Sequence, residues 1–357
     1  MNIARELTAN EKRKPLFEDP LKLPFGRNFT DHMFTMEFTP NSGWHNPRIK
    51  PYQPLLLDPS ANVFHYSQEV FEGQKAYRSK KDDILLFRPR ENARRFNRSL
   101  RRICMPEIAE EMFLEAECEL LKVEKRWVPG QKGASLYIRP TMIGTEAALG
   151  IKPSNDYLFY IILSPVGPYF KEGFDPVSLW VSDSYSRAGS GGTGEAKTGG
   201  NYAGSLLATR EATQKGYSQV LWLDAGEHRY VEEVGAMNIF FVMDGQLVTP
   251  ALGGTILHGI TRKSVLELAP DLGIRAEERR IAIDEVIAGI VSGRVSEVFG
   301  AGTAAVISPV GKIGFAGRDH VINDNQTGPW AKKFFDTMTG MQYGELEDKR
   351  GWIYVVK

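Results

Sequence analysis

One stretch of the chain indicates both its fold and its chemistry, and it reads Gly189-Ser190-Gly191-Gly192-Thr193-Gly194-Glu195-Ala196-Lys197-Thr198-Gly199-Gly200-Asn201-Tyr202. Six of the twelve residues from 189 to 200 are glycine, and the single cation among them is Lys197. Glycine permits positive φ and close approach of other groups to the backbone, at an entropic cost in the folded state. A chain that accepts this cost around one amine is expected to hold that amine in place. For the stretch taken alone, a flexible surface loop with a solvated lysine is the alternative.

The same stretch comes close to a phosphate-binding loop. From Gly191 to Thr198 it reads G-G-T-G-E-A-K-T, one residue away from G-x-x-x-x-G-K-[ST]. In that motif the lysine opens a helix whose N–H groups hold phosphate. Here Gly199 and Gly200 follow directly, and each glycine costs about 1 kcal/mol in a helix interior, so the helix is predicted to begin near Tyr202. A nucleotide-binding module built on residues 191–198 is the alternative from a different class of function.

The composition is typical of a globular protein in a reducing compartment. Of 357 residues, 42% are hydrophobic, and 44 basic residues balance 44 acidic ones, so no overall charge favours nucleic acid or an anionic membrane. Two cysteines, Cys104 and Cys118, argue against a disulfide framework or a cysteine-rich metal site. No signal peptide, transit peptide or long apolar run is visible. We therefore expect a cytoplasmic protein with no bound metal and with neither nucleic acid nor a membrane as its partner.

Hydrophobic periodicity predicts two α+β domains with a cleft between them. The smaller N-terminal domain covers residues 1–166 and starts with an extended arm over 1–30. Residues 167–177, in a proline-rich segment, link it to a larger C-terminal domain over 178–357. Strands are predicted at 32–39, 52–57, 63–66, 73–78, 84–87, 136–139, 158–163, 178–181, 220–223, 230–232, 238–242, 246–249, 297–299 and 304–307. Helices are predicted at 90–103, 106–123, 261–272 and 283–292, and Asp244-Gly245 predicts a hairpin turn.

A lysine in a glycine-lined pocket suggests Schiff-base chemistry, because a desolvated amine can attack a carbonyl. If that carbonyl belongs to pyridoxal phosphate, the protein must also supply a partner for the pyridine nitrogen and a cup for the phosphate. Glu233, at a predicted strand end, offers the first. Gly259-Ile260-Thr261-Arg262 before a helix and the glycine turn at 300–304 offer N–H groups and a hydroxyl for the second. Taken singly, each could be an ordinary strand end, helix start or turn.

Taken together, these segments resemble the branched-chain amino-acid aminotransferases, which are pyridoxal-phosphate enzymes of fold type IV. The resemblance runs from about residue 30 to the C-terminus, and six segments keep their order and approximate spacing. The segments are Val70-Phe71-Glu72-Gly73, Ser135-Leu136-Tyr137-Ile138-Arg139-Pro140-Thr141, the stretch around Lys197, Glu233-Val234-Gly235-Ala236-Met237-Asn238, Gly259-Ile260-Thr261-Arg262 and Phe299-Gly300-Ala301-Gly302-Thr303-Ala304.

The resemblance implies a role in cofactor binding for each matching position. Lys197 would form the Schiff base with pyridoxal 5'-phosphate and then carry a proton between substrate and cofactor. Glu233 would face the pyridine nitrogen and keep it protonated, and Tyr202 would hydrogen-bond the ring oxygen. Arg95 would pair with the phosphate. The rest of the phosphate cup would come from the backbone of Ile260 and Thr261 and the hydroxyl of Thr303.

The resemblance also implies a substrate pocket that accepts apolar side chains as well as glutamate. Phe71, Tyr137 and Tyr169 would line it. The residues that would meet the charged groups of the substrate are Tyr66 near the α-carboxylate, the turn at Thr303-Ala304 that holds this carboxylate through N–H groups, and Arg139 at the distal carboxylate of glutamate.

The implied activity is reversible ping-pong transfer of the amino group between leucine, isoleucine or valine and 2-oxoglutarate. The enzyme would be a cytoplasmic homodimer with its active site in the cleft between the two domains. A D-amino-acid aminotransferase or an aminodeoxychorismate lyase of the same fold would use the same lysine and glutamate, and these remain the nearer alternatives.

Overall fold

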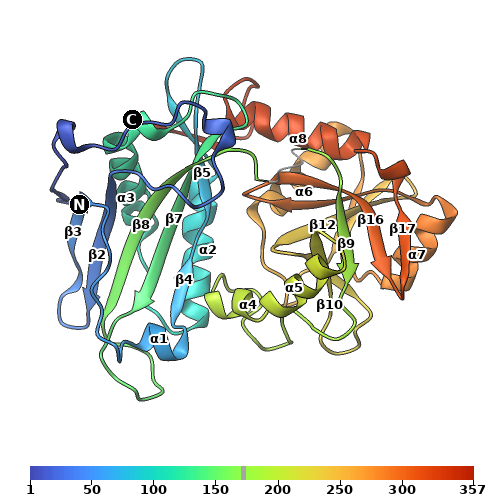
Figure 1. The fold of residues 1–357 in the computed structure, drawn as a ribbon, viewed down its shortest axis with the longest axis horizontal. Helices are drawn as coiled ribbons and strands as arrows, with labels where there is room; N and C mark the ends of the chain where they lie inside the picture. Colours follow the sequence, from blue (N-terminus) through green and yellow to red (C-terminus); the bar gives the residue numbers. More distant parts are fainter. Residues whose placement is uncertain (170–173) are drawn as a thin grey trace. The chain divides into compact units, whose positions relative to one another are not determined.

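The structure is a computed structural model that describes residues 1–169 and 174–357 (Figure 1). Contacts between its residues define two units, each built on one β-sheet. The first unit contains Met1–Tyr169, Ala196–Gly199 and Gly340–Lys357, and the rest of the described chain forms the second. Both units combine helices with strands, which confirms the predicted two-domain α+β fold class. Of the linker predicted at 167–177, residues 170–173 lie outside the described residues.

The segment Ala196–Gly199, which carries Lys197, belongs to the first unit although its sequence neighbours belong to the second.

The sheet of the first unit is antiparallel except where β1 pairs with β3, as far as the described residues show. Its strand order is β1-β3-β2-β8-β7-β5-β6-β18, and β4 pairs with β7. The strands are β1 (Ala4–Arg5), β2 (His32–Thr39), β3 (Gly43–Pro51), β4 (Glu69–Phe71), β5 (Gln74–Arg78), β6 (Ile84–Phe87), β7 (Ser135–Gly144), β8 (Tyr157–Val166) and β18 (Ile353–Val356).

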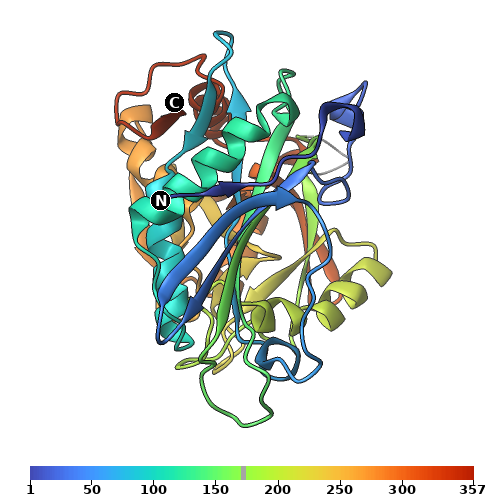
Figure 2. The same cartoon turned by 90° about the vertical axis from the view of Figure 1, so that its left-hand side faces the viewer.

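Two long helices, α2 (Pro89–Arg102) and α3 (Glu110–Val123), cover one face of this sheet (Figure 2). Pro89 at the first helical position of α2 suits a helix start, because the missing N–H would have no partner there. Phe96 of α2 and Phe113 of α3 pack against Phe159 of β8, with ring centroids 5.7 and 5.8 Å apart. All three rings are fully buried, and each such side chain contributes about 1.5–3 kcal/mol to folding.

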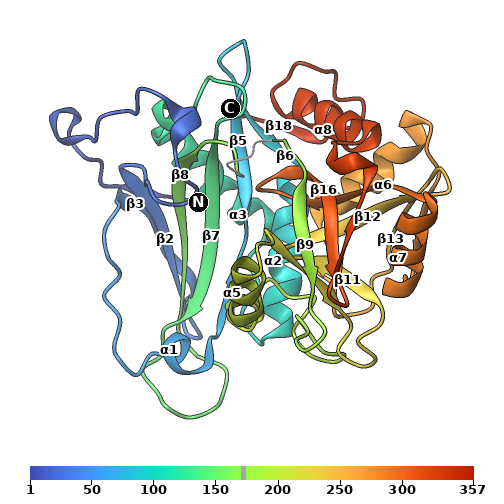
Figure 3. The same cartoon turned by 45° about the vertical axis from the view of Figure 1, so that its right-hand side comes forward.

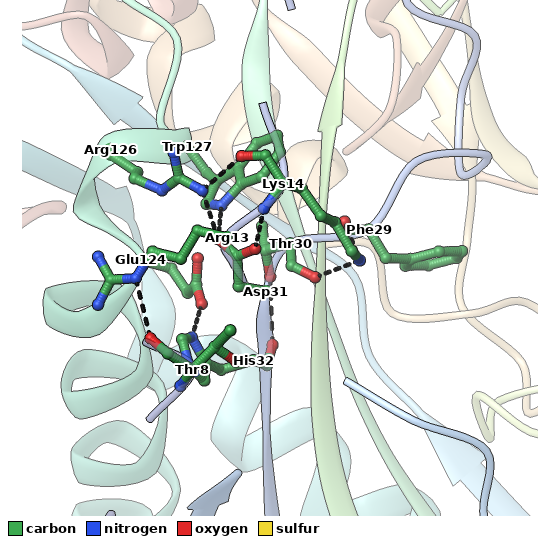
Figure 4. Close-up of polar contacts among 10 residues, drawn as sticks. All are labelled: Thr8, Arg13, Lys14, Phe29, Thr30, Asp31, His32, Glu124, Arg126 and Trp127. Carbon is green, nitrogen blue, oxygen red and sulfur yellow. Dashed lines mark hydrogen bonds and ion pairs between the residues drawn. The ribbon is translucent and has the colours of Figure 1, made fainter. Parts of the chain in front are cut away.

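A buried carboxylate ties the N-terminal arm to the first unit (Figure 4). Asp31, just before β2, accepts hydrogen bonds from the backbone N–H of Lys14 at 2.8 Å, from Arg126 Nη2 at 2.6 Å and from Trp127 Nε1 at 2.9 Å. Arg126 and Trp127 belong to the short 3-10 helix η3 (Lys125–Trp127) that follows α3. The arm itself contains β1 and two more 3-10 turns, η1 (Asn10–Lys12) and η2 (Pro20–Lys22).

The next residue, His32, makes a second buried contact with the arm (Figure 4). Its Nε2 accepts the backbone N–H of Thr8 at 2.8 Å, and its Nδ1 faces Glu124. A ring nitrogen that accepts an N–H carries no proton, so the neutral ring is protonated on Nδ1 and donates to the Glu124 carboxylate.

Two strands predicted in the first unit are absent from the described structure. Residues 52–57 form no regular element, because Pro51 and Pro54 lack N–H donors and the N–H of Tyr52 goes to the Asp31 carbonyl. The predicted strand at 63–66 is the short helix α1 (Asn62–Tyr66). It is fixed by the loop between β7 and β8, whose Ala148 carbonyl accepts the Asn62 side chain at 3.1 Å.

The sheet of the second unit closes on itself within the described chain. Neighbouring strands pair in the order β11-β10-β9-β16-β15-β12, and β12 pairs with β11 to close the ring. Strands β13 and β14 extend the sheet beyond β12, and β17 pairs with β16. The strands are β9 (Val177–Val181), β10 (Gln219–Leu223), β11 (Val231–Val234), β12 (Met237–Met243), β13 (Gln246–Pro250), β14 (Ala276–Arg279), β15 (Val295–Gly302), β16 (Val306–Phe315) and β17 (Arg318–Val321). The remaining elements are α4 (Gly199–Ala203), α5 (Leu206–Gln214), α6 (Ile260–Leu272), α7 (Ile283–Ser292), η4 (Asn323–Asn325) and α8 (Pro329–Gln342).

The hairpin of β12 and β13 is confirmed, and Asp244 and Gly245 both have positive φ, as a two-residue hairpin turn requires. The predicted helix start near Tyr202 is wrong, because α4 already begins at Gly199. A Cβ on Gly199 would lie 2.0 Å from Glu69 Oε1, so close packing requires glycine there in spite of its poor helix propensity. The strand predicted at 304–307 begins only at Val306. No helix among residues 1–169 and 174–357 is long and apolar enough to cross a membrane.

Candidate active site

The segment that carries Lys197 is fixed to the first unit by backbone hydrogen bonds. The N–H of Lys197 donates to Ser99 Oγ of α2 at 2.9 Å, and its carbonyl accepts the N–H of Phe71 at 3.0 Å. Thr198 Oγ1 donates to the Glu69 carbonyl at 2.8 Å. The segment thus lies beside β4, and the glycine-rich stretch positions its lysine through long-range partners.

Lys197 shares an aromatic ring with an arginine. Its Nζ lies 4.9 Å from the centroid of Phe71, and the Arg139 guanidinium lies 4.7 Å from the same centroid. Arg139 also lies 5.3 Å from the ring of Tyr137 and donates from Nη2 to the Tyr137 hydroxyl at 3.1 Å. Cations are attracted to the faces of such rings. The first unit therefore gathers four of the predicted site residues into one half-buried cluster.

Arg95 is held by a carboxylate to which the sequence analysis assigned no role. Glu72, at 0% exposure, accepts Arg95 Nε at 2.7 Å and Arg95 Nη2 at 2.8 Å on its two oxygens. Asn92 Nδ2 at 2.8 Å and the N–H of Gly73 at 3.1 Å also donate to it. Burial alone would raise the pKa of Glu72, but Arg95, with Lys197 and Asn92, outweighs burial and holds the pKa below its usual value.

Two further aromatic residues of the prediction lie in different surroundings within the first unit. Tyr169 packs edge-on against Phe25 of the N-terminal arm, with ring centroids 5.2 Å apart, and Phe25 contacts Tyr137 in the same way at 4.7 Å. Tyr66, at the end of α1, donates its hydroxyl to the Leu149 carbonyl in the loop between β7 and β8. Phe25 thus lies with the predicted pocket residues, whereas Tyr66 lies at the exposed end of α1.

In the second unit, Glu233 is buried and held from two sides. Its Oε1 accepts Asn238 Nδ2 at 2.9 Å from the position directly opposite on β12, and its Oε2 pairs with Arg187 Nε at 2.5 Å. Asn238 also donates to the Leu257 carbonyl at 3.0 Å, and Arg187 Nη2 donates to the Gly194 carbonyl at 2.9 Å. A carboxylate fixed in this way beside a cation is suited to face a protonated ring nitrogen.

Ile260 and Thr261 form the first turn of α6, which begins one residue earlier than the helix predicted at 261–272. Its N-cap residue is Gly259, which has no side chain that could cap the helix. A Cβ on Gly259 would lie 1.8 Å from Asn238 Oδ1, so the helix start must approach β12 closely. Uncapped N–H groups at a helix N-terminus favour an anion, and Asn238 connects this helix start to Glu233.

Thr303 and Ala304 lie in the turn between β15 and β16, and Tyr202 lies in α4. The end of β15 just before this turn approaches Met237 closely, since a Cβ on Gly302 would lie 2.8 Å from Met237 Cγ. Val306, just after it, has φ 64°, a conformation that a β-branched residue rarely adopts. Such strain persists only where the surrounding structure fixes the backbone.

Besides Phe25, three polar or charged residues at these sites escaped the sequence analysis as functional candidates: Glu72, Asn238 and Arg187. Glu72 and Asn238 stood within the quoted motifs without a role, and their buried contacts now supply one. Arg187 lies outside the quoted motifs. Its pairing with Glu233 could not be read from the local sequence, because Glu233 lies on a strand far away along the chain. Only a count of buried charges could have suggested that Glu233 needs a cationic partner.

Comparison with known proteins gives consistent matches. Residues 69–313 match the family model of the class IV amino-transferases. The chain is 54% identical over 347 residues to branched-chain-amino-acid aminotransferase 2 of Bacillus subtilis, covering 97% of this chain and 95% of that protein. The crystal structure of the branched-chain amino acid aminotransferase of Escherichia coli has a TM-score of 0.76 at 29% identity, over 92% of this chain and 99% of that one. The branched-chain amino acid aminotransferase of T.th., solved with pyridoxamine 5'-phosphate, has a TM-score of 0.75 at 30% identity, over 90% and 98%.

Proposed function

The chain belongs to the class IV aminotransferase family, and on this basis we propose that it transfers the amino group reversibly between leucine, isoleucine or valine and 2-oxoglutarate. The observation that carries the proposal is the 54% identity, over 97% of this chain, to a branched-chain-amino-acid aminotransferase. That match favours the branched-chain substrates over those of a D-amino-acid aminotransferase or an aminodeoxychorismate lyase. The family match covers residues 191–198, so the nucleotide-binding alternative is dropped.

Class IV aminotransferases use pyridoxal 5'-phosphate, and the residues of this chain fit that group. The buried Glu233 carboxylate, fixed by Arg187 and Asn238, suits a protonated pyridine nitrogen. The uncapped start of α6, where Gly259 leaves no room for a side chain, suits a phosphate. When bound, the cofactor supplies an electron sink for the charge that develops at the substrate Cα.

Each site residue then has a defined task. The Lys197 amine would hold the cofactor covalently and, once released by the substrate, would accept the proton from the substrate Cα and return it. Its backbone bonds to Ser99 and Phe71 restrict the directions that this amine can reach. Glu233 would keep the proton on the ring nitrogen. The remaining cofactor contacts would be Tyr202 at the ring oxygen, with Arg95, Ile260, Thr261 and Thr303 at the phosphate.

The cluster around Phe71 offers both kinds of surface that the two substrates need. The rings of Phe71 and Tyr137 present apolar surface for a branched side chain, and Arg139 lies against both rings with a charge for the distal carboxylate of glutamate. We assign Tyr169 to the same pocket, since Phe25 links it to Tyr137. The α-carboxylate contacts would come from Tyr66 and the turn at Thr303-Ala304.

We also propose that the enzyme is a homodimer in the cytoplasm. Helix α1 and the loop between β7 and β8 lie side by side (Figure 3). Both carry exposed apolar side chains: Phe64 is 60% exposed, Leu149 62% and Ile151 90%. A monomer rarely exposes such side chains together, and a second copy would cover them. Tyr66 lies at the same place. Both cysteines are free thiols, as a reducing compartment favours. Light scattering on the purified protein tests the dimer, and a monomer would contradict it.

The substrate assignment is tested by visible absorbance and by product analysis. The purified protein should be yellow, its visible band should shift on addition of L-leucine, and glutamate should form when 2-oxoglutarate is added. Lys197→Ala should remove the band and the activity, whereas Lys12→Ala, a change in the exposed turn η1, should keep both. A band that shifts with a D-amino acid but not with L-leucine would contradict the branched-chain assignment.

A further inference from the structure

We propose that Glu72 is a positioning residue for the cofactor phosphate, acting through Arg95. The inference rests on the proposed function, in which Arg95 binds that phosphate. Glu72 itself would touch neither substrate nor cofactor. Its part is to fix the plane and the direction of the guanidinium before the phosphate arrives.

The contact between the two side chains has the geometry that fixes a guanidinium. Both oxygens of Glu72 accept from Arg95, at 2.7 Å from Nε and 2.8 Å from Nη2. Because a guanidinium is planar, two parallel hydrogen bonds determine the orientation of the whole group, which one bond would leave free to rotate. An arginine oriented in this way loses less conformational freedom when it binds a phosphate.

Glu72 is in turn held rigidly by the first unit. Asn92 of α2 and the N–H of Gly73 both donate to its Oε2, so the carboxylate accepts four hydrogen bonds. Glu72 is 0% and Arg95 4% exposed. Burying two charges costs desolvation free energy unless the two groups are well paired and hydrogen-bonded. A buried Glu72–Arg95 contact without a role would therefore destabilise the fold to no purpose.

The same helix connects Arg95 to the lysine of the active site. The Arg95 carbonyl accepts Ser99 Oγ at 3.0 Å, and Ser99 Oγ accepts the N–H of Lys197 at 2.9 Å. Glu72 is the residue after Phe71, whose N–H donates to the Lys197 carbonyl. The pair therefore forms part of the framework that holds the covalent anchor, and it can set the distance at which the phosphate is bound.

A second buried acid in the same core provides a matched control. Glu117 of α3 is 1% exposed and accepts from Gln74 on β5. Burial raises the pKa of Glu117 well above its usual value, and the neighbouring charge of Glu72 raises it further. The pKa shifts of the two acids run in opposite directions, so the charged form is favoured at Glu72 and disfavoured at Glu117. Glu117→Gln should therefore leave the contacts of Arg95 unchanged, whereas Glu72→Gln should leave Arg95 without its counter-charge.

The test compares two ligands that differ only in the phosphate. Apoenzyme is titrated with pyridoxal 5'-phosphate and with pyridoxal, and binding is followed by tryptophan fluorescence and visible absorbance. Glu72→Gln should weaken pyridoxal 5'-phosphate about tenfold or more, the scale of a lost charged hydrogen-bond partner, and should change pyridoxal by less than about twofold. Glu117→Gln should leave both affinities unchanged. Glu72→Asp keeps the charge but is too short for both contacts, so it should show a smaller loss of the same kind, and it carries the test if Glu72→Gln does not fold.

Two results would overturn the inference. Equal losses for both ligands would show that Glu72 only supports the fold, and unchanged binding of pyridoxal 5'-phosphate would show that Arg95 needs no orientation. Failure of the proposed function would look different. A wild-type protein that binds pyridoxal 5'-phosphate but does not transaminate L-leucine would contradict the substrate assignment. The ratio of the affinities for pyridoxal 5'-phosphate and pyridoxal would still show whether Glu72 positions Arg95.

Discussion

Replacing Asp31 by alanine should release the N-terminal arm from the first unit. The carboxylate of Asp31, just before β2, joins this part of the chain to two others. It accepts hydrogen bonds from Lys14 in the arm and from Arg126 and Trp127 after α3 (Figure 4). Arg126 Nη2 also donates to the Lys14 carbonyl at 2.7 Å, and this contact would lose its orientation together with Asp31. The change removes the common acceptor of all three donors.

The expected cost follows from what each donor does afterwards. Water can reach Arg126, whose side chain is 30% exposed, so that loss is partly compensated. Trp127 is 3% exposed, and its indole N–H would stay buried without an acceptor. A buried unsatisfied donor costs about 1–3 kcal/mol, and a hydrogen bond to a charged group contributes about 1.5–3 kcal/mol. We expect Asp31→Ala to lower the free energy of unfolding by about 3 kcal/mol.

This cost should depend on pH in a definite direction. Burial alone would raise the pKa of Asp31, but the hydrogen bonds from Arg126, Lys14 and Trp127 outweigh it and lower the pKa. A carboxylate whose pKa is lower in the folded state stabilises the fold above its unfolded pKa of about 3.9, and this contribution is lost as the pH falls through the folded-state value. The difference between wild type and variant should therefore be full at neutral pH and should shrink below about pH 4.

The assay is urea unfolding of both proteins, with amide hydrogen exchange at Thr8 and Lys14. In the variant both amides should exchange faster, and trypsin should cut after Lys12 and Arg13 sooner. Glu18→Ala, which removes an exposed charge from the same arm, should change neither measurement. If Asp31→Ala unfolds more easily while Thr8 and Lys14 keep their protection, the carboxylate does not hold the arm, and the reasoning fails.

Two other positions, Glu117 and Gly259, give further predictions. Because the pKa of Glu117 is raised in the folded state, its contribution to stability is lost as the pH rises above the unfolded value of about 4.3. Glu117→Gln should therefore gain stability relative to wild type as the pH rises above that value in urea titrations, and identical pH profiles would contradict this. Gly259→Ala must displace Asn238 from Glu233, which should cost about 1–3 kcal/mol and weaken binding of pyridoxal 5'-phosphate. Gly253→Ala, with nothing within 4 Å of the added Cβ, is its control, and equal effects of the two changes would refute the argument.

Elements with a strong local signal were predicted correctly. The helix α2 has apolar residues at helical spacing and a proline at its start, and the β12–β13 hairpin has its Asp-Gly turn. Elements that depend on distant partners were missed. The chain from Tyr52 onward bonds to Asp31 instead of a neighbouring strand, and α4 begins at a glycine that packing against Glu69 requires. Local propensity is a weak prior where tertiary contacts outweigh it.

The sequence by itself determined the family, because a lysine among glycines, a strand-end glutamate and the Gly259-Ile260-Thr261-Arg262 helix start are local patterns that match it. Only the tertiary structure decided what holds these residues. It showed that the segment of Lys197 belongs to the first unit, that Glu72 fixes Arg95, and that Arg187 holds Glu233. The physical reason is that a buried charge requires a partner, and the packing of distant segments selects that partner.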